Sequence, residues 1–299
     1  MGKKVLVTGA NGFIGTQVVI EATNRGFGVI AFDRHQSNHH PEGTETFLGD
    51  IRDFESINEA VQKVDYAINL AGILGTQELV NDPIPAVQTN TIGCLNFLKA
   101  MKSSKFHAPQ GVEIGIGNHY MNNPYSISKD MAERFTFMYN KEHGTKVAIV
   151  RGFNAYGPRQ HHKPVRKMVP YFIVQALNGE NLEVYGDGEQ IADMIHVNDL
   201  ARILVDAAVK DHGVYDSVLE AGTGIRSSVN QVAEAIKKAI GNPDVQITHT
   251  EMRPGETKGA VVLGDPSTLK PLGEQKFISL DEGMKQTVEW YRENYDWKK

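Results

Sequence analysis

The sequence holds a single cysteine, Cys94, in 299 residues, and it has no excess of positive charge. One thiol cannot close a disulfide within the chain, so the fold does not depend on an oxidising compartment. The 31 lysines and arginines are outnumbered by 36 aspartates and glutamates, which gives a formal net charge of −5. This balance excludes the overall basic surface that is typical of nucleic-acid-binding proteins, and we predict no nucleic-acid partner.

Long apolar runs are missing too. The apolar run within residues 1–13 is shorter than the core of a signal peptide, and no run approaches the roughly 18 apolar residues of a membrane span. We therefore expect a cytoplasmic protein without a membrane partner. Histidine pairs occur at 39–40 and 161–162, but no cysteine or carboxylate pattern accompanies them, so we predict no metal site.

The first half of the chain alternates short apolar runs with longer amphipathic ones. Continuous apolar strands separated by helices indicate a parallel sheet covered on both faces, and right-handed crossovers then give a doubly wound (Rossmann) α/β fold. Strands are expected at residues 4–8, 28–33, 46–48, 65–70, 112–116 and 146–151. Helices are expected at residues 13–24, 54–63, 85–102 and 125–142.

Beyond about residue 155, proline and glycine separate shorter elements, and a last amphipathic helix is expected at 280–295. A length of 299 residues suggests two domains, or one large domain with an appendage, because a domain has roughly 150 residues. We predict a Rossmann domain at 1–155, with a returning segment at about 190–212. Residues 156–299 then form mainly a smaller α+β domain.

Three glycines, Gly9, Gly12 and Gly15, lie directly between the first strand and the first helix. Glycine permits a tight turn and the close approach of a pyrophosphate, and the helix N-terminus offers N–H groups and a positive dipole end. Asp33 closes the second strand, where a carboxylate binds ribose hydroxyls and repels a 2′-phosphate. These features predict NAD rather than NADP, although Arg34 weakens the preference. Alternatively, Asp33 is a turn residue that ends the strand and does not bind the cofactor.

Tyr125 and Lys129 are four residues apart on a predicted helix, so they share one face. An ammonium group near a phenol favours the phenolate and lowers the pKa of the phenol, and a positive nicotinamide ring acts in the same direction. Tyr125 could then accept a proton from a sugar hydroxyl while hydride leaves for the cofactor.

These motifs resemble those of the extended short-chain dehydrogenase/reductases, in the branch of NAD-dependent sugar-nucleotide epimerases and dehydratases (UDP-glucose 4-epimerase-like). The resemblance covers nearly the whole chain. Besides the glycine motif and Asp33, the segments that carry it are 49–53, 90–93 with Asn96, 124–129, 151–159, 184–190, 196–201 and 253–256.

The resemblance implies that Tyr125 and Lys129 are the catalytic pair and that a UDP-sugar is the substrate. It also implies a homodimer through the helices at 85–102 and 125–142. It further implies that Asn154 and Arg253 bind the diphosphate of the substrate. The full set of candidate substrate contacts is Asn154, Arg159, Arg166, Val184 and Arg253. Candidate cofactor contacts are Gly9, Asn11, Gly12, Phe13, Ile14, Gly15, Asp33, Arg34, Asp50, Ile51, Leu70, Ala71, Gly72, Asn90, Tyr125 and Lys129.

The chain departs from the family pattern before the catalytic tyrosine. The usual Ser/Thr aligns with Gly117, and Asn118, His119 or Thr76 are the candidates to replace it. The loop that carries the acid pair of 4,6-dehydratases is also missing. We therefore predict an epimerase that inverts C4 of a UDP-sugar through a 4-keto intermediate. The alternatives are a 4-ketoreductase, an atypical dehydratase, and a cofactor-binding sensor or scaffold without enzymatic activity.

Two polar residues in predicted strands are unexpected. Asn69 replaces the usual histidine at the end of the fourth strand. Glu113 places a carboxyl group in a buried strand, either as a satisfied polar residue of the core or as an active-site acid.

Overall fold

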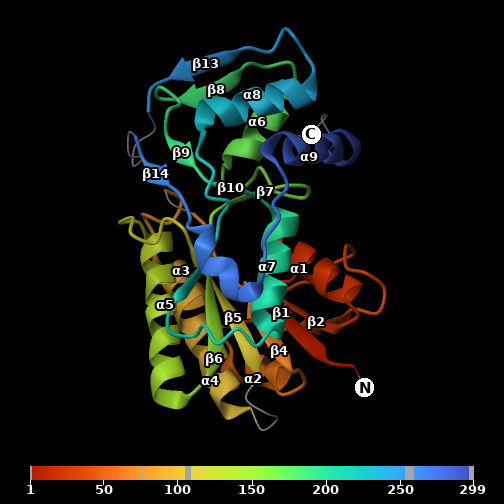
Figure 1. Ribbon diagram of the computed structural model, residues 1–299, viewed down its shortest axis with the longest axis vertical. Helices are drawn as coiled ribbons and strands as arrows, with labels where there is room; N and C mark the ends of the chain where they lie inside the picture. The colour runs from red at the N-terminus through yellow and green to blue at the C-terminus, as the bar shows by residue number, and fades with distance from the viewer. Residues whose placement is uncertain (1, 76, 105–108, 253–258, 296–299) are drawn as a thin grey trace. The chain divides into compact units, whose positions relative to one another are not determined.

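The computed structural model describes residues 2–75, 77–104, 109–252 and 259–295 (Figure 1). The chain divides into two compact units, each made of three segments. The first unit comprises Met1–Gly152, Leu200–Ala221 and Pro266–Gln275. The second unit comprises Phe153–Asp199, Gly222–Asp265 and Lys276–Lys299.

The first unit is built on a seven-stranded sheet in the order β11-β6-β5-β4-β1-β2-β3, in which all neighbouring strands run parallel. This order is the doubly wound arrangement, so the predicted Rossmann fold is confirmed. Its strands are β1 (Lys4–Thr8), β2 (Gly28–Asp33), β3 (Glu45–Leu48), β4 (Tyr66–Asn69), β5 (Gln110–Ile116), β6 (Lys146–Gly152) and β11 (Val218–Ala221).

The helices predicted at 13–24, 54–63 and 125–142 are found within two residues of their expected bounds. The helices of this unit are α1 (Phe13–Asn24), α2 (Phe54–Val61), α3 (Ile84–Ala86), the π-helix η1 (Val87–Ile92), α4 (Gly93–Ser103), α5 (Pro124–His143), most of α7 (Val197–Val209) and the 3-10 helix η2 (Pro266–Leu272). On one face of the sheet, alternate strand residues such as Leu6, Ala67 and Val147 pack against apolar side chains of α2, α4 and α5.

The helix predicted at 85–102 is not one regular helix, because a π-helical segment at Val87–Ile92 separates α3 from α4. A π-helical turn inserts residues into an α-helix and changes which side chains face inward. Here Asn90 and Thr91 are both buried, and both hydrogen-bond to Ser128 of α5. The sequence pattern does not distinguish this insertion from regular helix.

Local sequence fixes both ends of α5, which carries the predicted catalytic pair. The side chain of Asn123 accepts a hydrogen bond from the N–H of Ser126 at 2.9 Å, and Pro124 occupies the first turn, where its missing N–H costs nothing. Gly144 ends the helix in the left-handed conformation with φ 66°.

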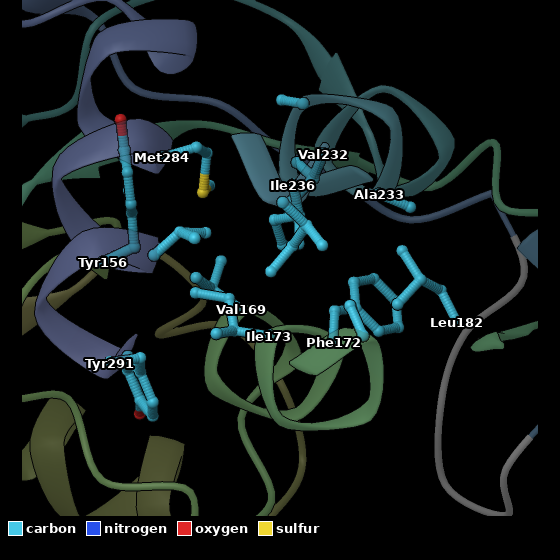
Figure 2. Close-up of a cluster of buried hydrophobic side chains, with 14 of the residues drawn as sticks. Tyr156, Val169, Phe172, Ile173, Leu182, Val232, Ala233, Ile236, Met284 and Tyr291 are labelled. Atoms are coloured by element: carbon cyan, nitrogen blue, oxygen red, sulfur yellow. The ribbon is translucent and has the colours of Figure 1, made fainter. Parts of the chain in front are cut away.

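The second unit contains a hydrophobic core formed by helices and short strands (Figure 2). Phe172 and Ile173 of one helix pack with Val232 and Ile236 of another, and Met284 of the last helix joins them. The elements are β7 (Asn154–Tyr156), α6 (Met168–Leu177), β8 (Leu182–Tyr185), β9 (Ile191–Ala192), β10 (Met194–His196), the start of α7, β12 (Ser227–Ser228), α8 (Val229–Ile240), β13 (Ile247–Thr250), β14 (Val261–Val262) and α9 (Leu280–Asn294).

Among the residues described here, none of the helices combines the length and apolarity that crossing a bilayer requires. The same residues contain no group of three or more histidine, cysteine, aspartate or glutamate side chains placed to hold a metal ion.

Truncation of the second unit's core should destabilise the protein. Ile236 is fully buried in this core, whereas Ile225 is 63% exposed. We expect Ile236→Ala to lower the free energy of unfolding by about 2–5 kcal/mol, because it removes buried methyl groups and leaves a cavity. The matched control Ile225→Ala should change it by less than about 0.5 kcal/mol in urea denaturation. Equal effects of the two changes would contradict this assignment of the core.

Candidate functional site

The turn between β1 and α1 brings backbone atoms unusually close together. Gly9 has φ +64°, and a Cβ atom there would lie 3.0 Å from the backbone of Ala71. A Cβ atom on Gly15 would lie 2.1 Å from the carbonyl oxygen of Gly9, which is a severe clash. Gly12 is the N-cap of α1, and no side chain caps this helix end. The turn and its uncapped helix end fit a pyrophosphate group.

Asp33 lies at the carboxyl end of β2, next to this turn. Its carboxylate accepts hydrogen bonds from the backbone N–H of Asn11 at 3.0 Å and of Arg34 at 2.8 Å. The first bond ties the end of β2 to the glycine turn and fixes the carboxylate beside it. A carboxylate in this place fits the ribose hydroxyls of a dinucleotide. Phe13 and Ile14 are partly buried in the first turn of α1, and Arg34 is exposed.

The loop after β4 is fixed by two polar side chains. Thr8 Oγ1 accepts hydrogen bonds from the N–H groups of Leu70 and Ala71, each at 3.1 Å. Asn90 is 1% exposed, and its side chain bonds to both backbone polar groups of Ile73. Asn90 therefore stabilises the conformation of this loop. Thr8 was missed in the sequence, although a hydroxyl directly before the first glycine was a signal for it.

Asp50 and Ile51 follow β3 and differ in their surroundings. The Asp50 carboxylate pairs with the guanidinium of Arg52 at 2.6 Å, and this pair lowers the pKa of Asp50 below its ordinary value. Ile51 is buried in the core beneath α2 and α4. The Asp50 side chain is therefore paired and partly exposed, whereas the Ile51 side chain packs in the core.

Tyr125 and Lys129 lie one turn apart at the start of α5, close enough for each to shift the pKa of the other. Burial raises the pKa of Tyr125 above the ordinary value of a phenol, and the Lys129 ammonium opposes this only in part. The expected net lowering of the Tyr125 pKa is therefore not found in the protein alone. Lys129 is 4% exposed, and its Nζ donates to Glu113 Oε1 at 2.7 Å.

The segment 117–123, between β5 and α5, carries two of the candidates for the missing hydroxyl. His119 Nδ1 lies 3.6 Å from a carboxylate oxygen of Asp130, and Asn118 donates to the sulfur of Met121 at 3.5 Å. Neither contact involves Tyr125. The third candidate, Thr76, lies outside the residues that the structure describes.

The candidate substrate residues belong to the second unit. Asn154 donates from its side chain to the carbonyl of Asp193 at 3.2 Å. Arg159 has φ 71°, an uncommon conformation for a residue with a side chain. The Arg166 guanidinium lies 3.4 Å from the centre of the Tyr171 ring and pairs with Glu183 at 3.0 Å.

The other two candidate substrate residues of this unit are Val184 and Arg253. Val184 was predicted to contact the substrate. This prediction is wrong, because the side chain is fully buried and packs in the hydrophobic core. Arg253 lies outside the described residues.

Comparisons with known proteins agree with this geometry. The sequence matches the NAD dependent epimerase/dehydratase family over residues 5–218. A putative UDP-glucose 4-epimerase of Methanocaldococcus jannaschii is 29% identical over 310 residues, which cover 97% of this chain and 99% of that protein. A UDP-N-acetyl-alpha-D-glucosaminuronate decarboxylase of Bacillus cytotoxicus is 29% identical over 321 residues, with 98% and 99% covered.

Among solved structures, the UDP-glucose 4-epimerase of Thermotoga maritima with UDP-glucose has a TM-score of 0.87 and 27% identity to this chain. The match covers 98% of this chain and 100% of that one. The predicted family resemblance and the predicted NAD dependence are confirmed at the level of the family.

The glycine turn gives a direct test of the cofactor site. Gly15→Ala places a methyl group against the Gly9 carbonyl, so the turn must open, and we expect NAD affinity to fall about tenfold or more, equivalent to about 1.4 kcal/mol. Isothermal titration calorimetry measures this loss. Gly152→Ala is the control, since its new Cβ meets only ordinary contacts from 3.5 Å. Unchanged NAD affinity in Gly15→Ala would exclude this turn as the pyrophosphate site.

Proposed function

Since this chain belongs to the NAD dependent epimerase/dehydratase family, we propose that it uses NAD to invert the configuration at C4 of a UDP-sugar. One observation carries the proposal: Tyr125 and Lys129 share the first turns of α5 in a unit whose glycine turn and Asp33 fit a dinucleotide.

Tyr125 performs the proton transfers in this reaction. Its phenolate oxygen removes the proton of the C4 hydroxyl as hydride leaves C4, and the phenol returns that proton to O4 after hydride is delivered to the opposite face of the 4-keto sugar. NAD, when bound, accepts and returns the hydride, and its oxidised ring adds a positive charge that lowers the pKa of a nearby phenol. Lys129 favours the phenolate in the same way.

The second unit supplies candidates for the nucleotide diphosphate. A guanidinium donates two parallel hydrogen bonds to a phosphate, so Arg159 and Arg166 suit this role. The Arg166 guanidinium, held between Tyr171 and Glu183, is already oriented before substrate binds. Asn154 and Arg253 are proposed to contact the same diphosphate.

The loop before α5 favours epimerisation over dehydration. Elimination of water requires an additional acid and base beside the sugar. Segment 117–123 contains Asn118, His119 and Tyr120 but no aspartate or glutamate. A reversible oxidation at C4 needs only a proton acceptor and NAD. Tyr125 would act as the acceptor, and the glycine turn with Asp33 would hold NAD.

Purified protein supplied with UDP-glucose or UDP-N-acetylglucosamine should convert at least one of them into a mixture with its C4 epimer, without net consumption of NADH. NMR of the sugar protons measures the inversion. Stoichiometric NADH consumption would instead identify a 4-ketoreductase, and loss of water would identify a dehydratase. Absence of any turnover would favour the sensor or scaffold.

Replacement of the proposed base should abolish this activity selectively. Tyr125→Phe removes the phenolic oxygen, so we expect kcat to fall by about 10² to 10⁴-fold while NAD still binds. Because burial raises the Tyr125 pKa, the wild-type rate should increase with pH as the phenol ionises. Tyr139→Phe, on the same helix, is the matched control. A fully active Tyr125→Phe enzyme would refute the assignment.

We also propose that α5 forms part of a homodimer interface. Ile127, Met131 and Met138 are 48%, 38% and 38% exposed, and their spacing places them on one stripe of the helix. Apolar side chains exposed on one face of a helix suit a contact with a second subunit.

A charge introduced into this stripe should separate the subunits. We expect Ile127→Asp to shift the protein from dimer to monomer in size-exclusion chromatography with light scattering, because the carboxylate would be desolvated in the interface. Ile225→Asp changes an exposed isoleucine in the second unit and should leave the mass unchanged. A monomeric wild-type protein would rule out the interface.

A further inference from the structure

Three polar side chains lie in one row across the middle of the sheet in the first unit. Thr8 of β1 is the register partner of Asn69 of β4, and Asn69 is the register partner of Glu113 of β5. Register partners in a parallel sheet project to the same face. The three side chains are therefore neighbours, on the face covered by α4 and α5.

Hydrogen bonds connect this row from end to end. Thr8 Oγ1 donates to Asn69 Oδ1 at 2.5 Å, and Asn69 Nδ2 donates to Glu113 Oε2 at 2.5 Å. The other oxygen of Glu113 accepts from Lys129 Nζ at 2.7 Å. All four residues are at most 4% exposed, so the chain is shielded from solvent.

One end of the row lies beside the glycine turn, and the other end contacts Lys129 of the tyrosine–lysine pair. Thr8 precedes Gly9 and holds the N–H groups of Leu70 and Ala71, which adjoin the glycine turn. Lys129 lies one helical turn from Tyr125. The row therefore ties the dinucleotide-binding turn to the catalytic pair.

The charge balance at Lys129 depends on Glu113. Burial, the largest single effect, lowers the pKa of Lys129, but the charge and hydrogen bond of Glu113, together with smaller contributions from Tyr125 and Cys94, raise the net pKa above the ordinary value of a lysine. The other titratable groups facing Lys129 are Tyr125 on its own helix and Cys94 on α4. Burial keeps the Cys94 thiol protonated by raising its pKa well above the ordinary value. Glu113 is thus the carboxylate that balances this ammonium.

We propose that Glu113, held by Asn69 and Thr8, is a positioning residue that fixes the Lys129 ammonium beside Tyr125 for the proton transfer. A buried lysine without a carboxylate partner would lose its charge or move toward water. Glu113 uses one of the three N–H bonds of the ammonium and leaves the others for Tyr125 and a cofactor ribose. This role rests on the proposed function, in which Tyr125 and Lys129 act on the sugar.

The test replaces the carboxylate by its neutral isostere in the full-length, NAD-loaded enzyme. In Glu113→Gln the ammonium form of Lys129 loses its partner, so the pKa of Lys129 should fall by about one unit or more. NMR titration of ¹³Cε-labelled lysine measures it, and the signal is assigned by its absence in Lys129→Arg. The epimerase rate should fall by about tenfold to a hundredfold, with an alkaline limb displaced to lower pH.

Glu133→Gln is the matched control. Glu133 is also buried, lies on α5 one turn beyond Lys129, and pairs with Arg151 at 2.5 and 3.0 Å. The same substitution therefore breaks a buried ion pair of the same helix without touching Lys129. It should lower the melting temperature but leave the Lys129 titration and the shape of the pH–rate profile unchanged.

Each outcome decides the proposal. An unaltered Lys129 titration in a folded Glu113→Gln protein overturns it. The proposal is also overturned if Glu133→Gln changes the pH–rate profile as much as Glu113→Gln does. If Glu113→Gln does not fold, the wild-type titration decides, because a Lys129 pKa at or below the ordinary lysine value contradicts the pairing. Failure of the epimerase assay alone refutes the proposed function, while the titration still reports the Lys129 environment.

Discussion

The register of the parallel sheet is the constraint on which the candidate site depends. Parallel pairing of β1 with β4 and of β4 with β5 brings Thr8, Asn69 and Glu113 into one row, although they are far apart in the sequence. A shift of one residue in either pairing would turn a polar side chain to the opposite face. The Glu113–Lys129 ion pair would then be lost, and with it the link to α5.

This row explains how a lysine can be buried and still remain charged. An unpaired ammonium in a protein interior costs several kcal/mol, so burial alone would favour the neutral amine. Glu113 offsets that cost, and Asn69 supplies a hydrogen bond to the second carboxylate oxygen.

The two units contribute different kinds of interaction. The first unit offers backbone groups and short polar contacts at a glycine turn, which suit a cofactor shared by many enzymes. The second unit offers Arg166 stacked on Tyr171 and an arginine at positive φ, held on irregular segments around a separate core. Specificity for one nucleotide-sugar is therefore expected to depend on the second unit, where sequence can vary without disturbing the parallel sheet.

Much of the first unit could be predicted from local pattern. The helix at 13–24 and the strand at 28–33 begin and end where their periodicity and flanking glycines indicate. The prediction of one regular helix at 85–102 was wrong. The π-helical segment there accompanies hydrogen bonds from Asn90 and Thr91 to α5, which local propensity does not indicate. Val184 was assigned to substrate from a motif, but tertiary packing places it in a core.

The sequence by itself determined the fold class, the glycine turn and the presence of a tyrosine–lysine pair on one helical face, since each follows from the spacing of neighbouring residues. It left the role of Glu113 open between a core residue and an active-site acid. Only the tertiary structure decided that Glu113 binds Lys129, because strand order and register, which no local pattern specifies, determine which distant side chains meet.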